Sequence, residues 1–130
     1  MAEARRASGL RVLALGATSA IAEATLRLLA EQGASFVLVA RSELNLAAVR
    51  DDLLTRGATA AIGYVSDLNE TESHAVMLAE AARALGGLDL ALIAHGVLGD
   101  QAEAERTYSA AEAILRTNLL STVSLVGWLA

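Results

Sequence analysis

The chain of 130 residues contains no cysteine, no lysine and very few aromatic residues. Without cysteine, neither a disulfide framework nor a thiolate metal site can form. Aromatic residues make up 3% of a chain that is 55% hydrophobic, so the core must be built from Leu, Val, Ile and Ala. That composition suits a buried parallel sheet covered by helices. The two histidines stand far apart in the sequence, and we therefore expect no metal site.

Positive charge is also scarce. All ten basic residues are arginine, the formal net charge is −5, and no basic cluster is larger than the pair Arg5–Arg6. Because such a charge does not attract a phosphate backbone, we expect no nucleic-acid partner. The first ten residues lack the apolar stretch of a secretory signal, and no run reaches about 18 apolar residues. We expect a cytoplasmic protein without a membrane span.

Two apolar patterns alternate along the chain. Continuous apolar runs predict buried strands, and apolar residues at helical spacing predict helices. Because the connections are short, this alternation favours parallel strands joined by crossover helices. The sequence predicts one α/β domain over residues 1–130: a doubly wound, Rossmann-type parallel sheet of about four strands, with helices on both faces. The predicted strands are 11–15, 35–40, 59–65 and 88–94, and the predicted helices are 20–31, 42–56, 69–85 and about 107 to 130.

Residue types at the helix ends support these boundaries. Ser42 is a predicted N-cap, and Gly57 is predicted to end the same helix. Asn69 and Glu72 fit the spacing of a capping box, which places the start of the next helix at residue 69.

A turn of small residues, GATSAIA from Gly16 to Ala22, follows the first predicted strand. Such a turn aims backbone N–H groups and a helix N-terminus at one point, which attracts a phosphate. The spacing is not that of the G-x-G-x-x-G fingerprint. Taken alone, the turn leaves two interpretations open, a nucleotide site and a packing turn without a ligand.

This turn resembles the TGxxxGxG turn of the short-chain dehydrogenase/reductase family. Gly16 matches the first glycine of that pattern, while Ala20 and Ala22 replace the second and third. Ala20 is the larger departure, because its methyl group would lie near the pyrophosphate and a positive φ would be strained there. The resemblance implies that the pyrophosphate is held by Gly16, Ala17, Thr18, Ser19, Ala20 and Ile21.

The end of the second predicted strand is the next stretch that resembles this family. No carboxylate stands at positions 38–42 to bind the ribose hydroxyls of NAD, and Arg41 and Ser42 occupy that place. An arginine there can neutralise the 2′-phosphate of NADP, whereas the alternative is a solvated arginine at a strand end. We expect the cofactor to be NADP(H) rather than NAD(H).

Two further stretches follow the third and fourth predicted strands. Asp67 and Leu68, in VSDLN, resemble the family's pair that contacts adenine, although Asp67 can equally support the start of the following helix. IAHG stands where the family has N-N-A-G, so that only Gly96 is retained. The resemblance places Ala94, His95 and Gly96 beside the cofactor, with His95 as a loop residue near the ribose rather than an acid/base group.

The last stretch, ILRTNLLSTVSL, contains Asn118. It matches the asparagine that in this family supports a water relay to the catalytic lysine, and the alternative is a buried asparagine that bridges backbone groups. The family's hydride transfer uses a tyrosine as general acid/base, a lysine four residues later and a serine. Because the chain has no lysine, it contains no Tyr-x-x-x-Lys pair. We expect it to be inactive alone and the natural protein to continue past Ala130.

The resemblance therefore implies the NADP(H)-binding portion of an oxidoreductase that acts on a carbonyl or secondary alcohol of a small molecule. The GATSAIA form also resembles members that reduce a keto-sugar bound to a polyprenyl lipid. Two alternatives stay open, a non-catalytic dinucleotide-binding module and a relative of the sugar-nucleotide epimerases. The apolar final helix resembles the one used in the family's dimer interface, which implies a homo-oligomer, either a dimer or a tetramer.

Overall fold

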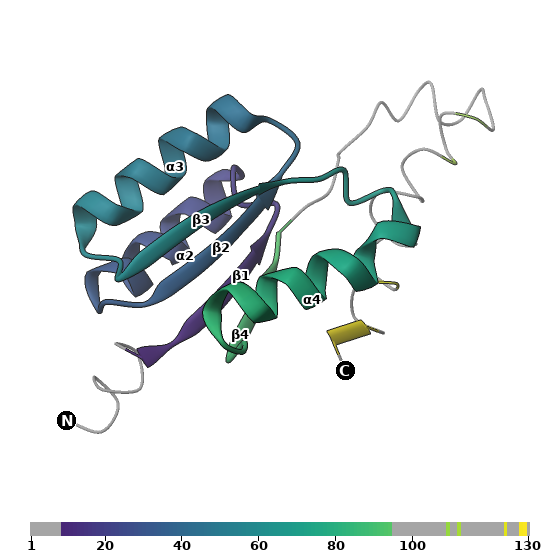
Figure 1. The fold of residues 1–130 in the computed structure, drawn as a ribbon. Helices are drawn as coiled ribbons and strands as arrows, with labels where there is room; N and C mark the ends of the chain where they lie inside the picture. The colour runs from purple at the N-terminus through teal and green to yellow at the C-terminus, as the bar shows by residue number, and fades with distance from the viewer. Residues whose placement is uncertain (1–8, 95–108, 110–111, 113–123, 125–127, 130) are drawn as a thin grey trace.

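Strands and helices alternate along the chain, as Figure 1 shows. The computed structural model describes residues 9–94, 109, 112, 124, 128 and 129. The strands are β1 (Arg11–Leu15), β2 (Ser35–Ala40), β3 (Ala60–Val65) and β4 (Leu90–Ile93), and the helices are α2 (Ala20–Glu31), α3 (Glu43–Arg56) and α4 (His74–Leu85).

The four strands form one parallel sheet in the order β3-β2-β1-β4. In the middle of the sheet, Leu13 of β1 pairs with Val37 of β2 and with Ala91 of β4. The chain first builds outward from β1 to β3 and then returns to place β4 on the other side of β1. This order is that of a doubly wound sheet, and the predicted fold class is confirmed.

The helices cover both faces of the sheet. Helices α2 and α3 lie on one face and α4 on the other (Figure 1). Because successive side chains of a strand point to opposite faces, Val12 of β1 packs with Leu26 of α2, whereas Leu13 packs with Met77 of α4. Both faces are therefore buried, which explains why β1 and β2 appear in the sequence as continuous apolar runs.

The predicted caps of α3 are present. The Ser42 hydroxyl accepts a hydrogen bond from the Asn45 amide at 3.2 Å. Gly57 ends the helix with a φ of 120°, which L-residues rarely adopt. A Cβ atom at this position would also lie 3.1 Å from the carbonyl oxygen of Ala30. The backbone conformation therefore favours glycine here, and a side chain would also make a tight contact with Ala30.

The predicted start of the helix at residue 69 is wrong. The Asn69 amide donates to Oδ1 of Asp67 at 2.9 Å, so residues 67–69 form a side-chain-closed turn. A short 3-10 helix, Thr71–Ser73, follows, and α4 begins only at His74. The capping-box pattern failed because Asp67 forms a competing turn just before it.

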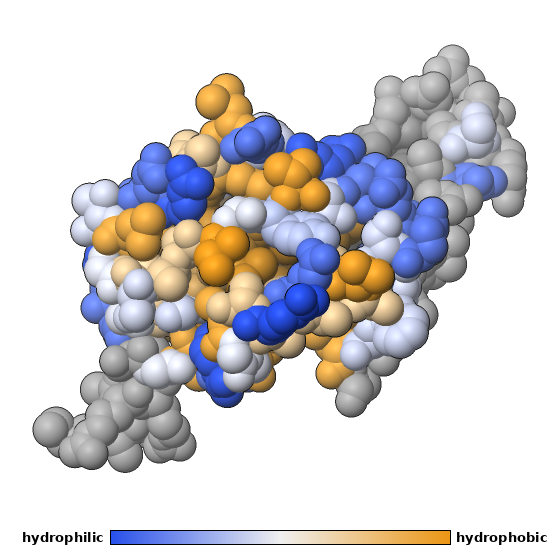
Figure 2. Space-filling model, viewed as in Figure 1, coloured by the Kyte–Doolittle hydropathy of each residue, from blue (hydrophilic) through white to orange (hydrophobic). Residues whose placement is uncertain are grey.

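Strand β3 is the outer strand of the described sheet, and its surface is partly apolar. Ile62 and Val65 keep 41% and 53% of their surface exposed. Figure 2 shows apolar side chains gathered over β3, in the space between α3 and α4. The sheet therefore presents an apolar border on this side.

Candidate nucleotide-binding site

The carboxyl ends of the parallel strands meet at one edge of the sheet. Leu15, the last residue of β1, pairs with Val39 of β2 and with Ile93 of β4. Strands β1 and β4 leave this edge at the point where the strand order reverses, which is where doubly wound sheets bind their ligands. The predicted site residues that follow the strand ends are Gly16, Arg41, Asp67 and Ala94.

The turn after β1 is hydrogen-bonded to β2. The amides of Gly16 and Ala17 donate to the carbonyl oxygen of Val39, at 2.9 and 3.0 Å. Gly16 has a φ of 85°, a conformation that only glycine adopts without strain. The Ser19 amide donates back to the Gly16 carbonyl at 3.2 Å. Gly16 thus shapes the turn, and its amide and that of Ala17 are engaged within the protein.

Three other amides of the predicted segment remain open toward the edge. Thr18, Ala20 and Ile21 donate backbone hydrogen bonds to no residue that the structure describes. The Ser19 hydroxyl accepts from the Ala22 amide at 3.1 Å and so caps α2. Open amides at a helix N-terminus, together with the helix dipole, attract an anion. The turn therefore has the donors that a pyrophosphate requires.

The alanines that replace the family's glycines do not distort this turn. Ala20 is the first residue of α2, and no described residue other than glycine has a positive φ. Ala22 is completely buried in the core cluster that also contains Ala14 and Leu26. The left-handed strain that alanine would suffer at position 20 is therefore absent.

Arg41 directly follows β2 and is exposed at the same edge. It forms no ion pair with any residue of the described part of the chain. Ser42 accepts a hydrogen bond as the cap of α3, and a hydroxyl that accepts in this way keeps its hydrogen for a second partner. The end of β2 thus presents a guanidinium and a hydroxyl, with no carboxylate at positions 38–42.

Asp67 and Leu68 form part of the turn after β3. Oδ1 of Asp67 accepts from the Asn69 amide at 2.9 Å, and its carbonyl accepts from the Glu70 amide at 3.0 Å. Asp67 therefore has a structural role in its own turn. Leu68 is only 6% exposed, so its side chain belongs to the core.

Ala94 is half-buried and continues the edge beside β1. Its amide donates to the carbonyl of Leu15 at 2.8 Å, which places it next to the turn at Gly16. The other predicted site residues, His95, Gly96 and Asn118, lie outside the described residues. The structure thus brings Gly16, Arg41, Asp67 and Ala94 to one edge.

The sequence was also compared with known protein families and relatives. A family model described as short chain dehydrogenase matches residues 11–130. The chain belongs to the short-chain dehydrogenase/reductase family. It is similar to an uncharacterized oxidoreductase of Mycobacterium tuberculosis, with 36% identity over 98 residues, which are 75% of this chain and 39% of that protein. A hydroxysteroid 11-beta-dehydrogenase 1-like protein of Xenopus tropicalis is 38% identical over 85 residues, which are 65% of this chain and 30% of that protein.

Solved structures of the family share the fold. A short-chain type dehydrogenase/reductase from Mycobacterium marinum aligns with a TM-score of 0.83 and 26% identity, covering 92% of this chain and 48% of that one. A xylitol dehydrogenase with NAD+ bound aligns with a TM-score of 0.84 and 21% identity, covering 92% of this chain and 46% of that one. The chain spans less than half the length of these relatives.

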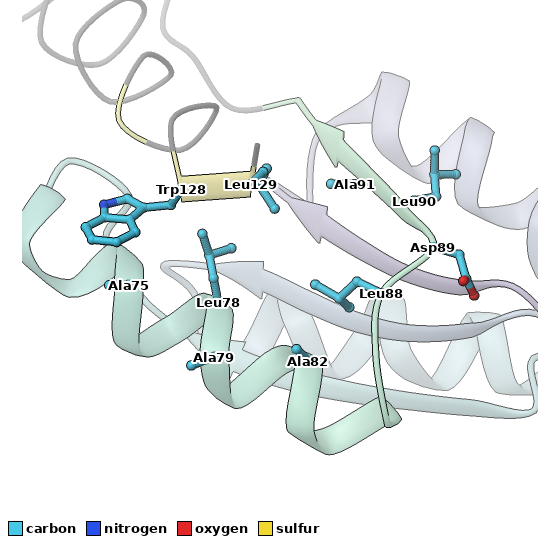
Figure 3. A pocket seen from close by; sticks show the side chains of 10 residues that line it. All are labelled: Ala75, Leu78, Ala79, Ala82, Leu88, Asp89, Leu90, Ala91, Trp128 and Leu129. Carbon is cyan, nitrogen blue, oxygen red and sulfur yellow. The ribbon is translucent and has the colours of Figure 1, made fainter.

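A cavity elsewhere in the chain is not the dinucleotide site. It has a volume of about 430 Å³ and lies between α4, the start of β4 and residues 128–129. Figure 3 shows Leu78, Leu88 and Trp128 around it, and Asp89 at its far end. Asp89 is paired with Arg11, and the described residues that line this mostly aliphatic cavity include no free cation for a phosphate.

Two polar side chains on the α4 side of the sheet tie neighbouring elements together. The Tyr64 hydroxyl of β3 hydrogen-bonds with the Glu80 carboxylate of α4, which raises the pKa of the tyrosine. Tyr64 thus links a strand to a helix. His74 is completely buried, and the sequence analysis gave it no role. Its signal was its position on the apolar face of α4, where His74, Met77, Leu78 and Ala81 recur at helical spacing.

Other site types find no support in the described part of the chain. No helix there is long and apolar enough to span a bilayer. Among the same residues, no three His, Asp or Glu side chains are grouped so that they could bind a metal ion.

Proposed function

We propose that this chain is the NADP(H)-binding portion of a short-chain dehydrogenase/reductase. The whole protein would transfer hydride between NADP(H) and a carbonyl or secondary alcohol of a small molecule. One observation carries the proposal: amides at the start of α2 that donate to no described residue lie at the same sheet edge as an exposed arginine without an ion pair among the described residues. When bound, the nicotinamide ring supplies or accepts the hydride.

The turn after β1 would bind the pyrophosphate. The amides of Thr18, Ala20 and Ile21 donate to its oxygens, and the dipole of α2 adds a favourable field at the same point. Gly16 and Ala17 contribute indirectly, because their hydrogen bonds to Val39 fix the turn against β2. Ser19 holds the first turn of the helix through its cap.

Arg41 would select the cofactor. A guanidinium can form two parallel charge-assisted hydrogen bonds with a phosphate, and the Ser42 hydroxyl would add a third donor. A ribose without the 2′-phosphate would instead need a carboxylate for its hydroxyls, and positions 38–42 contain none. Selection for NADP(H) therefore follows from the charge at the end of β2.

The remaining predicted residues complete the proposal. Asp67 and Leu68 would contact the adenine, and Ala94, His95 and Gly96 would line the ribose side of the cofactor. Asn118 would be the member of the catalytic set that this chain contains.

For the substrate we propose a small ketone or alcohol, with a keto-sugar as the first class to test. We also propose a homo-oligomer, which sedimentation analysis of the whole protein would test.

The decisive experiment compares two cofactors and two arginine variants on the whole protein as its gene encodes it. We expect tighter binding of NADPH than of NADH. Arg41→Ala should raise the Kd of NADPH about 10- to 100-fold, because hydrogen bonds to charged groups contribute roughly 1.5–3 kcal/mol. The Kd of NADH should change little, since NADH has no 2′-phosphate.

Arg50→Ala is the matched control, because Arg50 lies on α3 and pairs only with the neighbouring Asp51 among the described ion pairs. It should leave both Kd values unchanged. A preference for NADH, or an unchanged Kd of NADPH in Arg41→Ala, would contradict the proposal. NADPH binding without oxidation by any ketone or keto-sugar would favour the non-catalytic module.

A further inference from the structure

His74, the first residue of α4, has no solvent-exposed surface and is the one buried polar residue of the described chain. Its Nε2 lies 2.7 Å from the carbonyl oxygen of Leu68, and its Nδ1 lies 2.8 Å from Oγ of Ser124. Burial of a polar ring is costly unless its nitrogens are hydrogen-bonded. Both nitrogens of this ring are, so the histidine joins two distant parts of the chain.

The partners determine the direction of these bonds. A backbone carbonyl can only accept, so Nε2 carries a proton and donates it to Leu68. In the neutral imidazole, Nδ1 is then an acceptor for the Ser124 hydroxyl. The result is a directed chain from Ser124 through His74 to Leu68.

The acceptor of His74 belongs to a peptide unit that also orients Asp67. The Leu68 carbonyl and the Asn69 amide are the two polar groups of one planar peptide. The carbonyl accepts from His74, while the amide donates to Oδ1 of Asp67 at 2.9 Å. A rotation of this peptide would break both bonds together. His74 therefore controls the Asp67 carboxylate through a single rigid unit.

The 68–69 peptide lies between residues that are held by other contacts. The Ser66 amide is held by the Ala40 carbonyl at 3.0 Å, as a continuation of the strand pairing. The Leu68 side chain is fixed in the core with Val39 and Met77. The Glu70 amide also donates to the Asp67 carbonyl, and the Thr71 amide to the Asn69 carbonyl, both at 3.0 Å. To these bonds His74 adds the hydrogen bond from Nε2 to the Leu68 carbonyl, which favours the observed orientation of the 68–69 peptide.

We propose that His74 is a positioning residue for the adenine half of the dinucleotide. It holds the 68–69 peptide, and this peptide holds the Asp67 carboxylate in the orientation that meets the adenine. The inference rests on the proposed function, in which Asp67 and Leu68 contact that ring. Ser124 supports the arrangement, because its hydroxyl can donate to Nδ1 while Nε2 donates to the Leu68 carbonyl.

The test uses 2′,5′-ADP, which contains the adenine and the 2′-phosphate, and reduced nicotinamide mononucleotide, which contains neither. His74→Leu places an apolar side chain in the same buried position and removes both hydrogen bonds. His74→Gln can keep a donor near the position of Nε2. We expect the Kd of 2′,5′-ADP to rise about tenfold in His74→Leu and by less than about threefold in His74→Gln, on the scale of one hydrogen bond. The Kd of the nicotinamide mononucleotide should not change.

Val49→Ala is a control for stability alone. Val49 is buried on α3, on the other face of the sheet from His74. This variant should lower the Tm of the protein without a change in the Kd of 2′,5′-ADP. Ser73→Ala is a local control, because the Ser73 hydroxyl makes no cap hydrogen bond to α4, and it should also leave that Kd unchanged.

The outcomes separate the two proposals. A wild-type protein that binds 2′,5′-ADP, together with a folded His74→Leu variant of unchanged affinity, would overturn the role of His74 alone. A wild-type protein that binds neither 2′,5′-ADP nor NADPH would overturn the proposed function and this inference with it. If His74→Leu does not fold, Ser124→Ala decides: we expect a rise of about threefold in the Kd of 2′,5′-ADP, and an unchanged Kd would refute the proposal.

Discussion

The two edges of the same parallel sheet are built in opposite ways. At the amino end of the strands, the Arg11 guanidinium forms two hydrogen bonds of 2.9 Å with the Asp89 carboxylate and one of 2.6 Å with the Gly86 carbonyl. The Asp89 amide also donates to the Arg11 carbonyl at 2.8 Å, and the Arg11 amide donates to Oδ2 of Asp89 at 2.9 Å. At the carboxyl end, the amides of Thr18, Ala20 and Ile21 have no described acceptor, and Arg41 has no described ion-pair partner.

This difference separates stability from binding. Backbone donors need a partner from the protein, from water or from a ligand. Where the chain supplies the partner, as at Arg11 and Asp89, the edge stabilises the fold. Where it leaves donors facing outward at a helix N-terminus, a ligand can replace water. Substitutions at the carboxyl edge should therefore change the Kd of the cofactor, and substitutions at the amino edge should change the free energy of unfolding.

The largest expected effect comes from Gly16→Val at the carboxyl edge. Gly16 has a φ of 85°, which a β-branched residue adopts only with strain. The turn must then shift, and its open amides no longer converge on the pyrophosphate. We expect the Kd of NADPH, measured by calorimetry, to rise at least about 100-fold, which corresponds to roughly 2.7 kcal/mol.

Gly87→Ala is the matched change at the amino edge. Gly87 has a φ of 134°, and a Cβ atom there would approach the Arg11 guanidinium. The strain should lower the free energy of unfolding by about 1–3 kcal/mol without a change in the Kd of NADPH. Loss of binding in Gly87→Ala, or normal binding in Gly16→Val, would contradict the division between the edges.

A smaller effect is expected for Ser19→Ala, which removes a helix cap at the carboxyl edge. Its hydroxyl caps α2 through the Ala22 amide at 3.1 Å. Loss of an N-cap costs about 0.5–2 kcal/mol, so urea denaturation should show a decrease of this size. Ser42→Ala, which removes the cap of α3, should cost a similar amount. An unchanged free energy of unfolding in Ser19→Ala would mean that this cap does not stabilise α2.

The smallest effect is a pH dependence at the amino edge. Hydrogen bonds from Arg11 lower the pKa of Asp89 to about 2. A carboxyl group with a lower pKa in the folded state stabilises the protein above its unfolded pKa of about 3.9 and loses this contribution as the pH falls toward 2. Asp89→Asn should therefore flatten part of the decrease in Tm between about pH 4 and pH 2.

Arg11→Met gives an independent check of the cause. Without the guanidinium, the Asp89 carboxylate loses its main hydrogen-bond partner. The dependence of Tm on pH in this variant should resemble that of Asp89→Asn. A wild-type pH dependence in Arg11→Met would show that another group causes the decrease.

Local sequence patterns were sufficient for most of the elements. Strands β1 and β2 and helix α2 have the predicted bounds, because their apolar patterns are long and end at glycine or at a small polar cap. Strand β4 is shorter than predicted and covers Leu90–Ile93. Its first predicted residues instead form the connection in which Asp89 meets Arg11, a contact that depends on residues far apart in the sequence.

The site was predicted unevenly for a similar reason. The sequence placed the small-residue turn and Arg41 directly after two strands, and the structure brings both to the same edge of the sheet. The sequence could not show which amides of this turn lack a partner. The Gly16 and Ala17 amides donate to Val39, which belongs to another strand. The hydrogen bonds of His74 could not be predicted either, because its partners Leu68 and Ser124 come together only in the folded chain.

The sequence by itself determined the alternation of strands and helices, the aliphatic core and the family of the chain. These follow from periodicity, composition and short motifs, which are local properties. Only the tertiary structure decided which donors at the carboxyl edge remain open, where α4 begins and why a histidine is buried at its start. Each of these depends on hydrogen bonds between segments that are distant in the chain, and such bonds are decided by packing rather than by local preference.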